Sequence, residues 1–119
     1  MHIARAFLEA VSPRAVARAA EALWDGAAGG FQRRVLWLDD AEVALLVRAP
    51  AGFAIPSHRH RVDEECLVLR GEISSGSVSL NAGDFQIAPA GCTHDVGGAV
   101  TDVLVYLRGD SHCDFVQER

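Results

Sequence analysis

The sequence predicts a small all-β domain, a barrel of short strands, preceded by short helices. After Gly30, short β-branched and apolar runs alternate with turn residues, which is typical of an all-β sandwich or barrel. Before Gly30, the apolar residues recur at a helical spacing. The chain has 119 residues and is 50% hydrophobic, which is enough for one domain with its own core. We therefore expect an N-terminal helical extension over residues 1–30 and a β-barrel over residues 31–119.

The expected helices lie before Gly30. Ser12 and Pro13 form a start signal, with Ser as N-cap and Pro at the first helical position. Four apolar residues then fall on one helical face: Val16, Ala19, Ala20 and Leu23. The glycine-rich stretch 26–30 ends this helix, and the apolar residues of 3–11 predict another short one. We expect both helices to dock on the barrel or on a partner subunit.

The expected strands begin at residue 35. In chain order, strands are predicted over 35–38, 42–48, 66–73, 77–80, 85–88 and 103–107. Asp39 and Asp40 form the first turn, and residues 74–76 close a hairpin between the third and fourth strands. Residues 81–84 form a further turn, and Pro89-Ala90-Gly91 ends the strand 85–88.

Composition and charge exclude several classes of partner. The net charge is −5 and the chain has no lysine and no basic run, so nucleic acid is not expected to bind. No apolar run approaches the ~20 residues of a membrane span, and no secretory signal is evident. The three cysteines form no Cys-x-x-Cys pair, which favours a reducing compartment. We expect a cytoplasmic protein.

Four residues form a candidate metal site: His58, His60, Glu64 and His94. On a strand, His58 and His60 would point to the same face. Glu64 follows beyond a short bend at 61–63, and His94 comes from a separate strand. Three neutral nitrogens and one anionic oxygen suit a borderline divalent metal. We expect one such ion per chain, and the ligand set by itself suits zinc, iron, manganese, nickel or cobalt.

Turn residues at fixed positions frame these ligands. The two patterns are Gly52-x5-His58-x-His60-x3-Glu64-x6-Gly71 and Gly83-x5-Pro89-x-Gly91-x2-His94. This double pattern resembles the two motifs of the cupin family, with every spacing matched, over about residues 35–108. The family pattern continues to an Asn where this chain has Gly98. The resemblance implies a double-stranded β-helix barrel with the metal inside one open end.

A closer resemblance is to the cupin domain of ChrR-type anti-sigma factors. It rests on Ile-Pro-Ser-His-Arg-His at 55–60, on residues 63–72, and on residues 83–85 and 89–94. The resemblance implies zinc in the cupin. In that family a zinc-binding helical domain with a His-x3-Cys-x2-Cys motif binds the sigma factor, and these 119 residues lack that motif. We therefore expect a ChrR-like cupin without the sigma-binding domain.

Residues beside the ligands have more ordinary roles. Glu65 is the alternative candidate ligand to Glu64. Adjacent residues of a strand point to opposite faces, so only one of the two can enter the barrel, and the motif spacing selects Glu64. Arg59 and Arg61 should point outward, with salt bridges to Glu65 or Asp63.

The cysteines and the terminal histidines lie outside the expected ligand set. Cys66 shares strand parity with Val68 and is expected in the core. Cys92 is either a redox-sensitive thiol near the metal or a small buried residue, and we favour the second. His112 is expected to be exposed and without a partner.

Two function classes remain open. The first is a regulatory or sensing cupin whose metal keeps an open position for a small ligand or oxidant. The second is a metal-dependent dioxygenase or isomerase acting on a small oxygenated substrate. No general base is evident beyond the ligands, so we favour the first.

The interior cavity and the exposed strand edges of the expected barrel indicate two kinds of partner. Apolar residues such as Val68, Phe85 and Ile87 are candidates to line the metal's cavity, and parity leaves open which face inward. Such a cavity would suit a small-molecule ligand or substrate. We also expect a homodimer, because a small barrel exposes strand edges that need cover.

Overall fold

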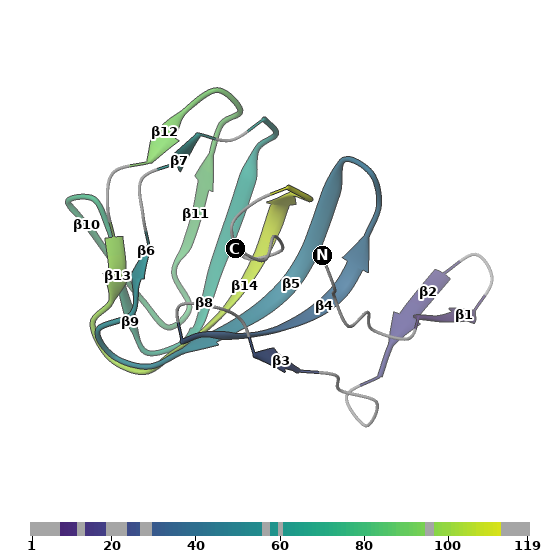
Figure 1. The fold of residues 1–119 in the computed structure, drawn as a ribbon, viewed down its shortest axis with the longest axis horizontal. Coiled ribbons are helices and arrows are strands. Elements are labelled where there is room, and N and C mark those ends of the chain that lie inside the picture. The colour runs from purple at the N-terminus through teal and green to yellow at the C-terminus, as the bar shows by residue number, and fades with distance from the viewer. Residues whose placement is uncertain are drawn as a thin grey trace.

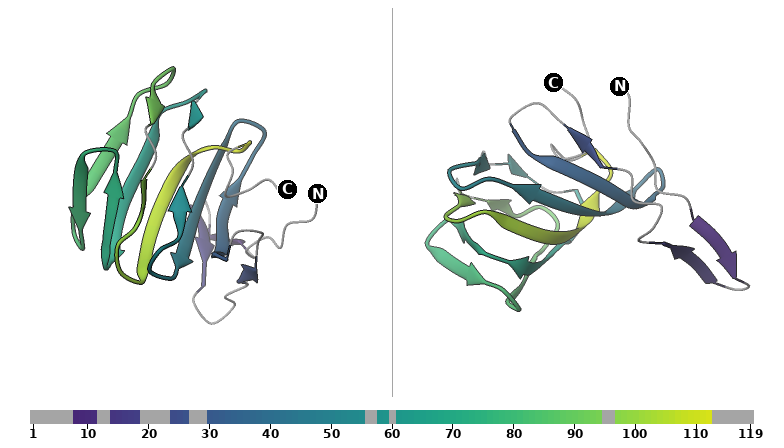
Figure 2. Two further views of the ribbon diagram at one scale, coloured as in Figure 1. Left: turned by 60° about the vertical axis from the view of Figure 1, so that its left-hand side comes forward. Right: turned by 90° about the horizontal axis from the view of Figure 1, so that it is seen from below.

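The fold is an all-β barrel flattened into two main sheets (Figures 1 and 2). The computed structural model describes residues 8–11, 14–18, 24–26, 30–55, 58–59, 61–94 and 97–112. All the regular elements in these ranges are strands. The same ranges hold no helix with the length and apolar character needed to cross a membrane.

The larger sheet has six strands in the order β11-β8-β14-β5-β4-β3. Its strands, in chain order, are β3 (Asp25–Gly26), β4 (Gln32–Leu38), β5 (Glu42–Ala49), β8 (Glu64–Arg70), β11 (Phe85–Ala88) and β14 (Val103–Asp110). β14 pairs antiparallel with both β5 and β8. Alternate residues of these strands face the second sheet, because side chains of a strand point to opposite faces in turn.

The second sheet has four strands in the order β10-β9-β13-β6. These are β6 (Ala54–Ile55), β9 (Glu72–Ser75), β10 (Val78–Asn81) and β13 (Gly97–Ala99). A separate pair, β7 (His58–Arg59) with β12 (Thr93–His94), lies nearby. Since β7 follows β6 and β12 precedes β13, this pair extends the second sheet toward one end of the barrel (Figure 1).

The hydrophobic core fills the space between the two sheets. Val43, Leu45 and Val68 of the larger sheet are 0% exposed. Ile73, on β9, and Ala99, on β13, are buried against them. Burying a side chain of this size contributes roughly 1.5–3 kcal/mol, so the core provides most of the force that holds the sheets together.

The chain changes sheet at Gly71, which corrects one predicted strand. Residues 66–73 were expected as one strand, but β8 ends at Arg70 and β9 begins at Glu72 in the other sheet. Gly71 has a φ of +83°, and a Cβ there would lie 2.2 Å from the carbonyl oxygen of Asp102. A residue in this left-handed conformation departs from the extended backbone of a strand, and here it marks the break between β8 and β9.

The other predicted strands are confirmed. Residues 85–88 form β11 with the predicted bounds, and the remaining predicted strands lie within β4, β5, β10 and β14 apart from Ser77 at one end. The turn at 81–84 is also present, since Asp84 N–H donates to the Asn81 carbonyl at 2.8 Å. In return, the Asp84 carboxylate accepts the Asn81 N–H at 2.7 Å.

The N-terminal helices are not seen in the residues that the structure describes, so this prediction is wrong there. Instead, β1 (Leu8–Val11) and β2 (Arg14–Ala17) form an antiparallel hairpin, and β3 pairs with β4. Ser12 and Pro13 fall between β1 and β2, and they suit a turn as well as a helix start. Residues 1–7, 12–13, 19–23 and 27–29 lie outside the described set. The domain boundary at residue 30 stays a prediction.

Besides the β3–β4 pairing, side-chain contacts attach the N-terminal segment to the larger sheet. Arg34 Nη2 donates to the carbonyl oxygen of Arg18 at 2.7 Å. The guanidinium of Arg48 lies 3.9 Å from the centre of the Trp24 ring, within reach of a cation–π contact. The β1–β2 hairpin forms a two-stranded sheet of its own and projects from the barrel (Figure 2).

Candidate metal centre

Two of the predicted ligands meet across the β7–β12 pair. His94 of β12 is the register partner of His58 of β7. Partners in an antiparallel pair lie on the same face of the sheet, close to one another. The backbone therefore brings together two histidines that are far apart in the sequence. His60 and the side chains of His58 and His94 lie outside the described set.

Glu64 enters the site from the opposite sheet. It is the first residue of β8, on the same face as Cys66 and Val68, which are 9% and 0% exposed. That face is the interior of the barrel. Glu65 occupies the other face, as strand alternation requires. Strand alternation thus puts Glu64 on the inner face and Glu65 on the outer face, and the assignment of Glu64 as a metal ligand stays a prediction.

A glycine lies beside the Glu64 side chain. Gly109 lies on β14, the neighbour of β8. A Cβ built on Gly109 would lie 3.4 Å from Glu64 Cγ and 3.5 Å from its Cβ. A Cβ at this position would thus be in ordinary van der Waals contact with Glu64, which shows that Gly109 and Glu64 are close neighbours on adjacent strands.

The loops that carry the ligands are hydrogen-bonded to each other. The Asp63 carboxylate accepts the N–H of Ala90 at 2.8 Å. Asp63 directly precedes Glu64, and Ala90 lies in the turn that leads to His94. Figure 1 shows β7, β12 and the first residues of β8 at the same end of the barrel.

The backbone placement of His58, His94 and Glu64 is compatible with a divalent metal, and so is the donor chemistry of all four predicted ligands. Three imidazoles and one carboxylate form a common set for zinc and similar ions. Among the described residues, with gaps at 56–57, 60 and 95–96, no three His, Cys, Asp or Glu side chains gather to hold an ion. The fit therefore rests on the His58–His94 register and on the inward face of Glu64.

The two described cysteines differ in environment. Cys66 is in the core, as expected, where burial and then the charge of Glu64 raise the pKa of its thiol to about 12. Cys92 is exposed, so the buried role favoured for it is wrong. The turn at Pro89, whose carbonyl accepts the Cys92 N–H at 3.1 Å, holds this residue at the surface.

The apolar residues proposed to line the cavity lie on two different faces. Val68 faces the interior. Phe85 and Ile87 are each 54% exposed, and their register partners Leu67 and Glu65 also belong to the outer face of β8. The residues of β11 that face inward are Gln86 and Ala88, the latter opposite Glu64.

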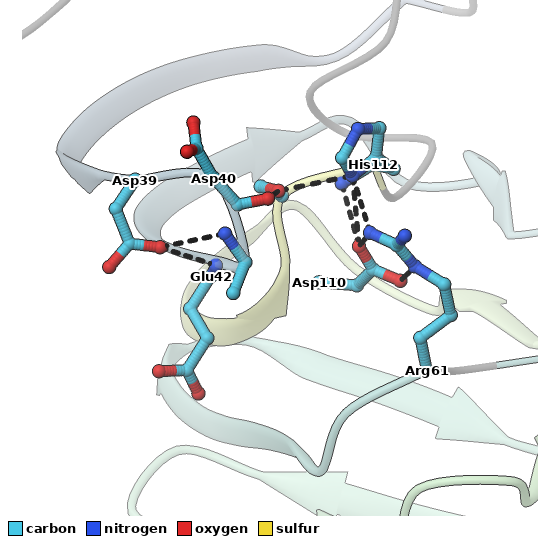
Figure 3. A network of polar contacts seen from close by, with 8 residues as sticks. Asp39, Asp40, Glu42, Arg61, Asp110 and His112 are labelled. Carbon is cyan, nitrogen blue, oxygen red and sulfur yellow. Dashed lines mark hydrogen bonds and ion pairs between the residues drawn. The ribbon is translucent and has the colours of Figure 1, made fainter.

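A polar network lies next to the site, formed by residues that the sequence patterns do not connect (Figure 3). Arg61 is bonded to Asp110 through two nitrogens, with Nε donating to Oδ2 at 2.6 Å and Nη2 contacting Oδ1. Nη2 also contacts Nδ1 of His112. The salt bridge expected from Arg61 to Glu65 or Asp63 is thus replaced by one to Asp110. His112 is exposed as expected, but it has partners.

The comparison with a family model matches nearly the whole chain. The model of the ChrR cupin-like domain matches residues 12–112. The anti-sigma-E factor ChrR of Cereibacter sphaeroides is 34% identical over 71 residues, which are 60% of this chain and 33% of that protein. The chain therefore spans about a third of that relative's length.

Solved structures show the same fold. The structure of Rhodobacter sphaeroides SigE in complex with the anti-sigma ChrR matches with a TM-score of 0.66 and 29% identity, over 78% of this chain and 51% of that one. An RmlC-like cupin from Shewanella frigidimarina matches with a TM-score of 0.69 and 20% identity, over 82% of this chain and 91% of that one. Together these matches support a cupin fold.

Proposed function

We propose, since the chain belongs to the ChrR cupin-like domain family, that it is a regulatory metal-binding cupin. One divalent ion is held by His58, His60, Glu64 and His94, with zinc as the first candidate. The observation that carries the proposal is the His58–His94 register pair, together with Glu64 on the inner face of β8. The β7–β12 pair provides two imidazoles and the larger sheet provides the carboxylate.

The metal is proposed to keep a position for a small ligand. An ion with three neutral ligands and one carboxylate retains positive charge, so it attracts anionic or bidentate oxygen groups. Val68 and Ala88 give the neighbouring interior an apolar character. A small carboxylate or diketone would combine an oxygen for the metal with an apolar body for these walls.

The metal site is tested by elemental analysis of full-length protein purified without a chelating tag. Wild type is expected to hold one equivalent of metal, and Glu64→Gln to lose most of it. Glu65→Gln is the matched control, because it changes the same group on the outer face of the same strand. Retention of a full equivalent by the His58→Ala/His60→Ala double variant would show that the site is misassigned.

The ligand position is tested by titration calorimetry with small carboxylates and diketones. Binding to the metal-loaded protein and not to the metal-stripped protein is expected. Equal binding to both forms, or none to either, would leave a structural metal as the better account. Oxygen consumption with any member of the panel would replace the regulatory role with that of a dioxygenase.

The protein is also proposed to act in the cytoplasm as a homodimer. β11 is an edge strand of the larger sheet, and its residues Phe85 and Ile87 are exposed. Exposed apolar edge strands are commonly covered by another chain. Light scattering at micromolar concentration is expected to give the mass of two chains, and the mass of one chain would contradict this.

A further inference from the structure

The bend between His60 and Glu64 is attached to the end of β14 by one ion pair. Arg61 lies in this bend and directs two guanidinium nitrogens at the two carboxylate oxygens of Asp110, the last residue of β14. Bidentate arginine–carboxylate pairs fix both the distance and the orientation of the two groups. Arg61 is the neighbour of one proposed ligand, and the bend ends at another.

Asp110 is itself firmly held. Its side chain is 8% exposed, and its Oδ1 also accepts the N–H of His112 at 2.8 Å. The next residue, Ser111, donates its N–H to the Ala41 carbonyl at 3.1 Å and its hydroxyl to the Asp40 carbonyl at 2.9 Å. These bonds join the end of β14 to the β4–β5 turn (Figure 3). Asp110 is therefore an anchor on the larger sheet.

We propose that Asp110 is a positioning residue for the metal centre, acting through Arg61 to hold the bend that carries His60 and Glu64. The proposal rests on the metal site proposed above and adds a residue that no ligand pattern includes. Asp110 acts by geometry, because its carboxylate is matched by the guanidinium and adds little net charge. Arg61 and Asp63 hold the two sides of the bend, one to β14 and the other to the turn before His94.

The physical reason is the entropy of the metal-free site. A bend without these bonds would sample many backbone conformations, and metal binding would have to order it. A bend held by Arg61 and Asp63 presents its ligands in one arrangement before the ion arrives. Removing residues that orient metal ligands typically costs 10–100-fold in metal affinity. We expect a loss near the lower end, about tenfold, because Asp63 still holds one side.

The test compares wild type with Asp110→Asn, Arg61→Ala and Arg61→Lys. Glu42→Gln is the matched control, since it removes the carboxylate partner of a different arginine, Arg108 of β14, whose Nη2 lies 3.4 Å from Glu42 Oε2. Zinc affinity is measured by competition with a chromophoric chelator, and site geometry by the visible spectrum of the cobalt-substituted protein. Asp110→Asn and Arg61→Ala should lose affinity about tenfold and change the cobalt spectrum. Arg61→Lys should fall between wild type and Arg61→Ala.

Amide hydrogen exchange of the metal-free proteins gives an independent readout. The segment 59–64 should exchange faster in Asp110→Asn than in wild type and Glu42→Gln, while the core strands stay protected. Unchanged exchange, or zinc affinity equal to that of Glu42→Gln, would overturn the proposal. Failure of wild type to bind zinc would instead overturn the metal site, and the exchange data would still show whether the ion pair holds the bend.

Discussion

At the scale of single residues, glycines with positive φ serve two different purposes. Gly71 and Gly83 adopt similar left-handed conformations, with φ of +83° and +93°. A Cβ on Gly83 would meet nothing within 4 Å, whereas one on Gly71 would lie 2.2 Å from the Asp102 carbonyl oxygen. Gly83 is thus needed for its backbone conformation alone. Gly71 also lets the crossing between sheets pack against the loop before β14.

Alanine at these two positions should separate conformational strain from steric overlap. Gly83→Ala should cost about 1–2 kcal/mol, the cost of a left-handed non-glycine residue. Gly71→Ala should cost about 3 kcal/mol or more, because the overlap with Asp102 is added to the same strain. Urea unfolding of wild type and both variants measures these losses in the free energy of unfolding. Equal losses would show that the crossing relaxes and that the close approach at Gly71 is unimportant.

The two described cysteines should differ in reactivity toward thiol reagents. Only the thiolate reacts, and the Cys66 thiol, with a pKa raised to about 12 by burial, stays protonated at pH 8. Cys92 is exposed and should be labelled. In a Cys113→Ser background, the native protein should therefore titrate one thiol and the urea-unfolded protein two. Labelling of native Cys92→Ser at the rate of the parent would contradict this assignment.

At the scale of elements, the β4–β5 hairpin depends on one acidic residue in its turn. The Asp39 carboxylate accepts the N–H groups of Ala41 and Glu42 at 2.9 and 2.8 Å. These backbone bonds lower the pKa of Asp39. Asp40 is also exposed, but it contributes its backbone carbonyl to the contact with Ser111. The ionised Asp39 carboxylate therefore stabilises the turn.

Asp39→Ala should destabilise the protein at neutral pH more than Asp40→Ala. Because the pKa of Asp39 is lowered in the folded state, its stabilising effect is present above the unfolded value near 4 and is lost as the pH falls below it. The difference in urea midpoint between wild type and Asp39→Ala should thus shrink between pH 6 and pH 3. A difference that is constant with pH would show that the carboxylate charge does not hold the turn.

The strands of the barrel could be predicted from sequence because each depends on local pattern. Residues 85–88 alternate and are bounded by Asp84 and Pro89, so that their strand was predicted with its observed ends. The N-terminal segment could not be predicted this way. Alanine-rich residues such as 14–17 suit a helix face by spacing, and only pairing with β1 makes them a strand. The break at Gly71 was also missed, because the close approach of the Asp102 carbonyl that requires glycine there comes from a distant part of the sequence.

The ligand candidates could be named from sequence because their spacing is local within each motif. The residues proposed to hold these ligands in position could not be predicted from the sequence. Arg61 and Asp110 are separated by 49 positions, and their contact exists only when β14 lies beside β8. Arg61 had nearer acidic candidates in Asp63 and Glu65. Asp63 instead bonds to Ala90, and Glu65 lies on the outer face.

At the scale of the whole molecule, the proposed metal would join the two sheets. His58 and His94 belong to the pair that extends the smaller sheet, and Glu64 belongs to the larger one. At this end of the barrel the sheets are also connected by the bend that includes Arg61 and Asp63. An ion bound by residues of both sheets would cross-link them at the end of the barrel that carries β7, β12 and the start of β8.

Metal binding should therefore raise the thermal stability of the full chain. An ion that binds only the folded state stabilises it by about 2.7 kcal/mol at a free concentration 100 times its dissociation constant. For a domain of this size, that corresponds to a rise in Tm of about 10 °C. Calorimetry of wild type with zinc and with chelator should show this rise, and Glu65→Gln should match it. Glu64→Gln should show little or no rise, because its site has lost the one ligand contributed by the larger sheet. An equal rise in Glu64→Gln would mean that zinc stabilises the protein from another place and that Glu64 does not join the sheets through the metal.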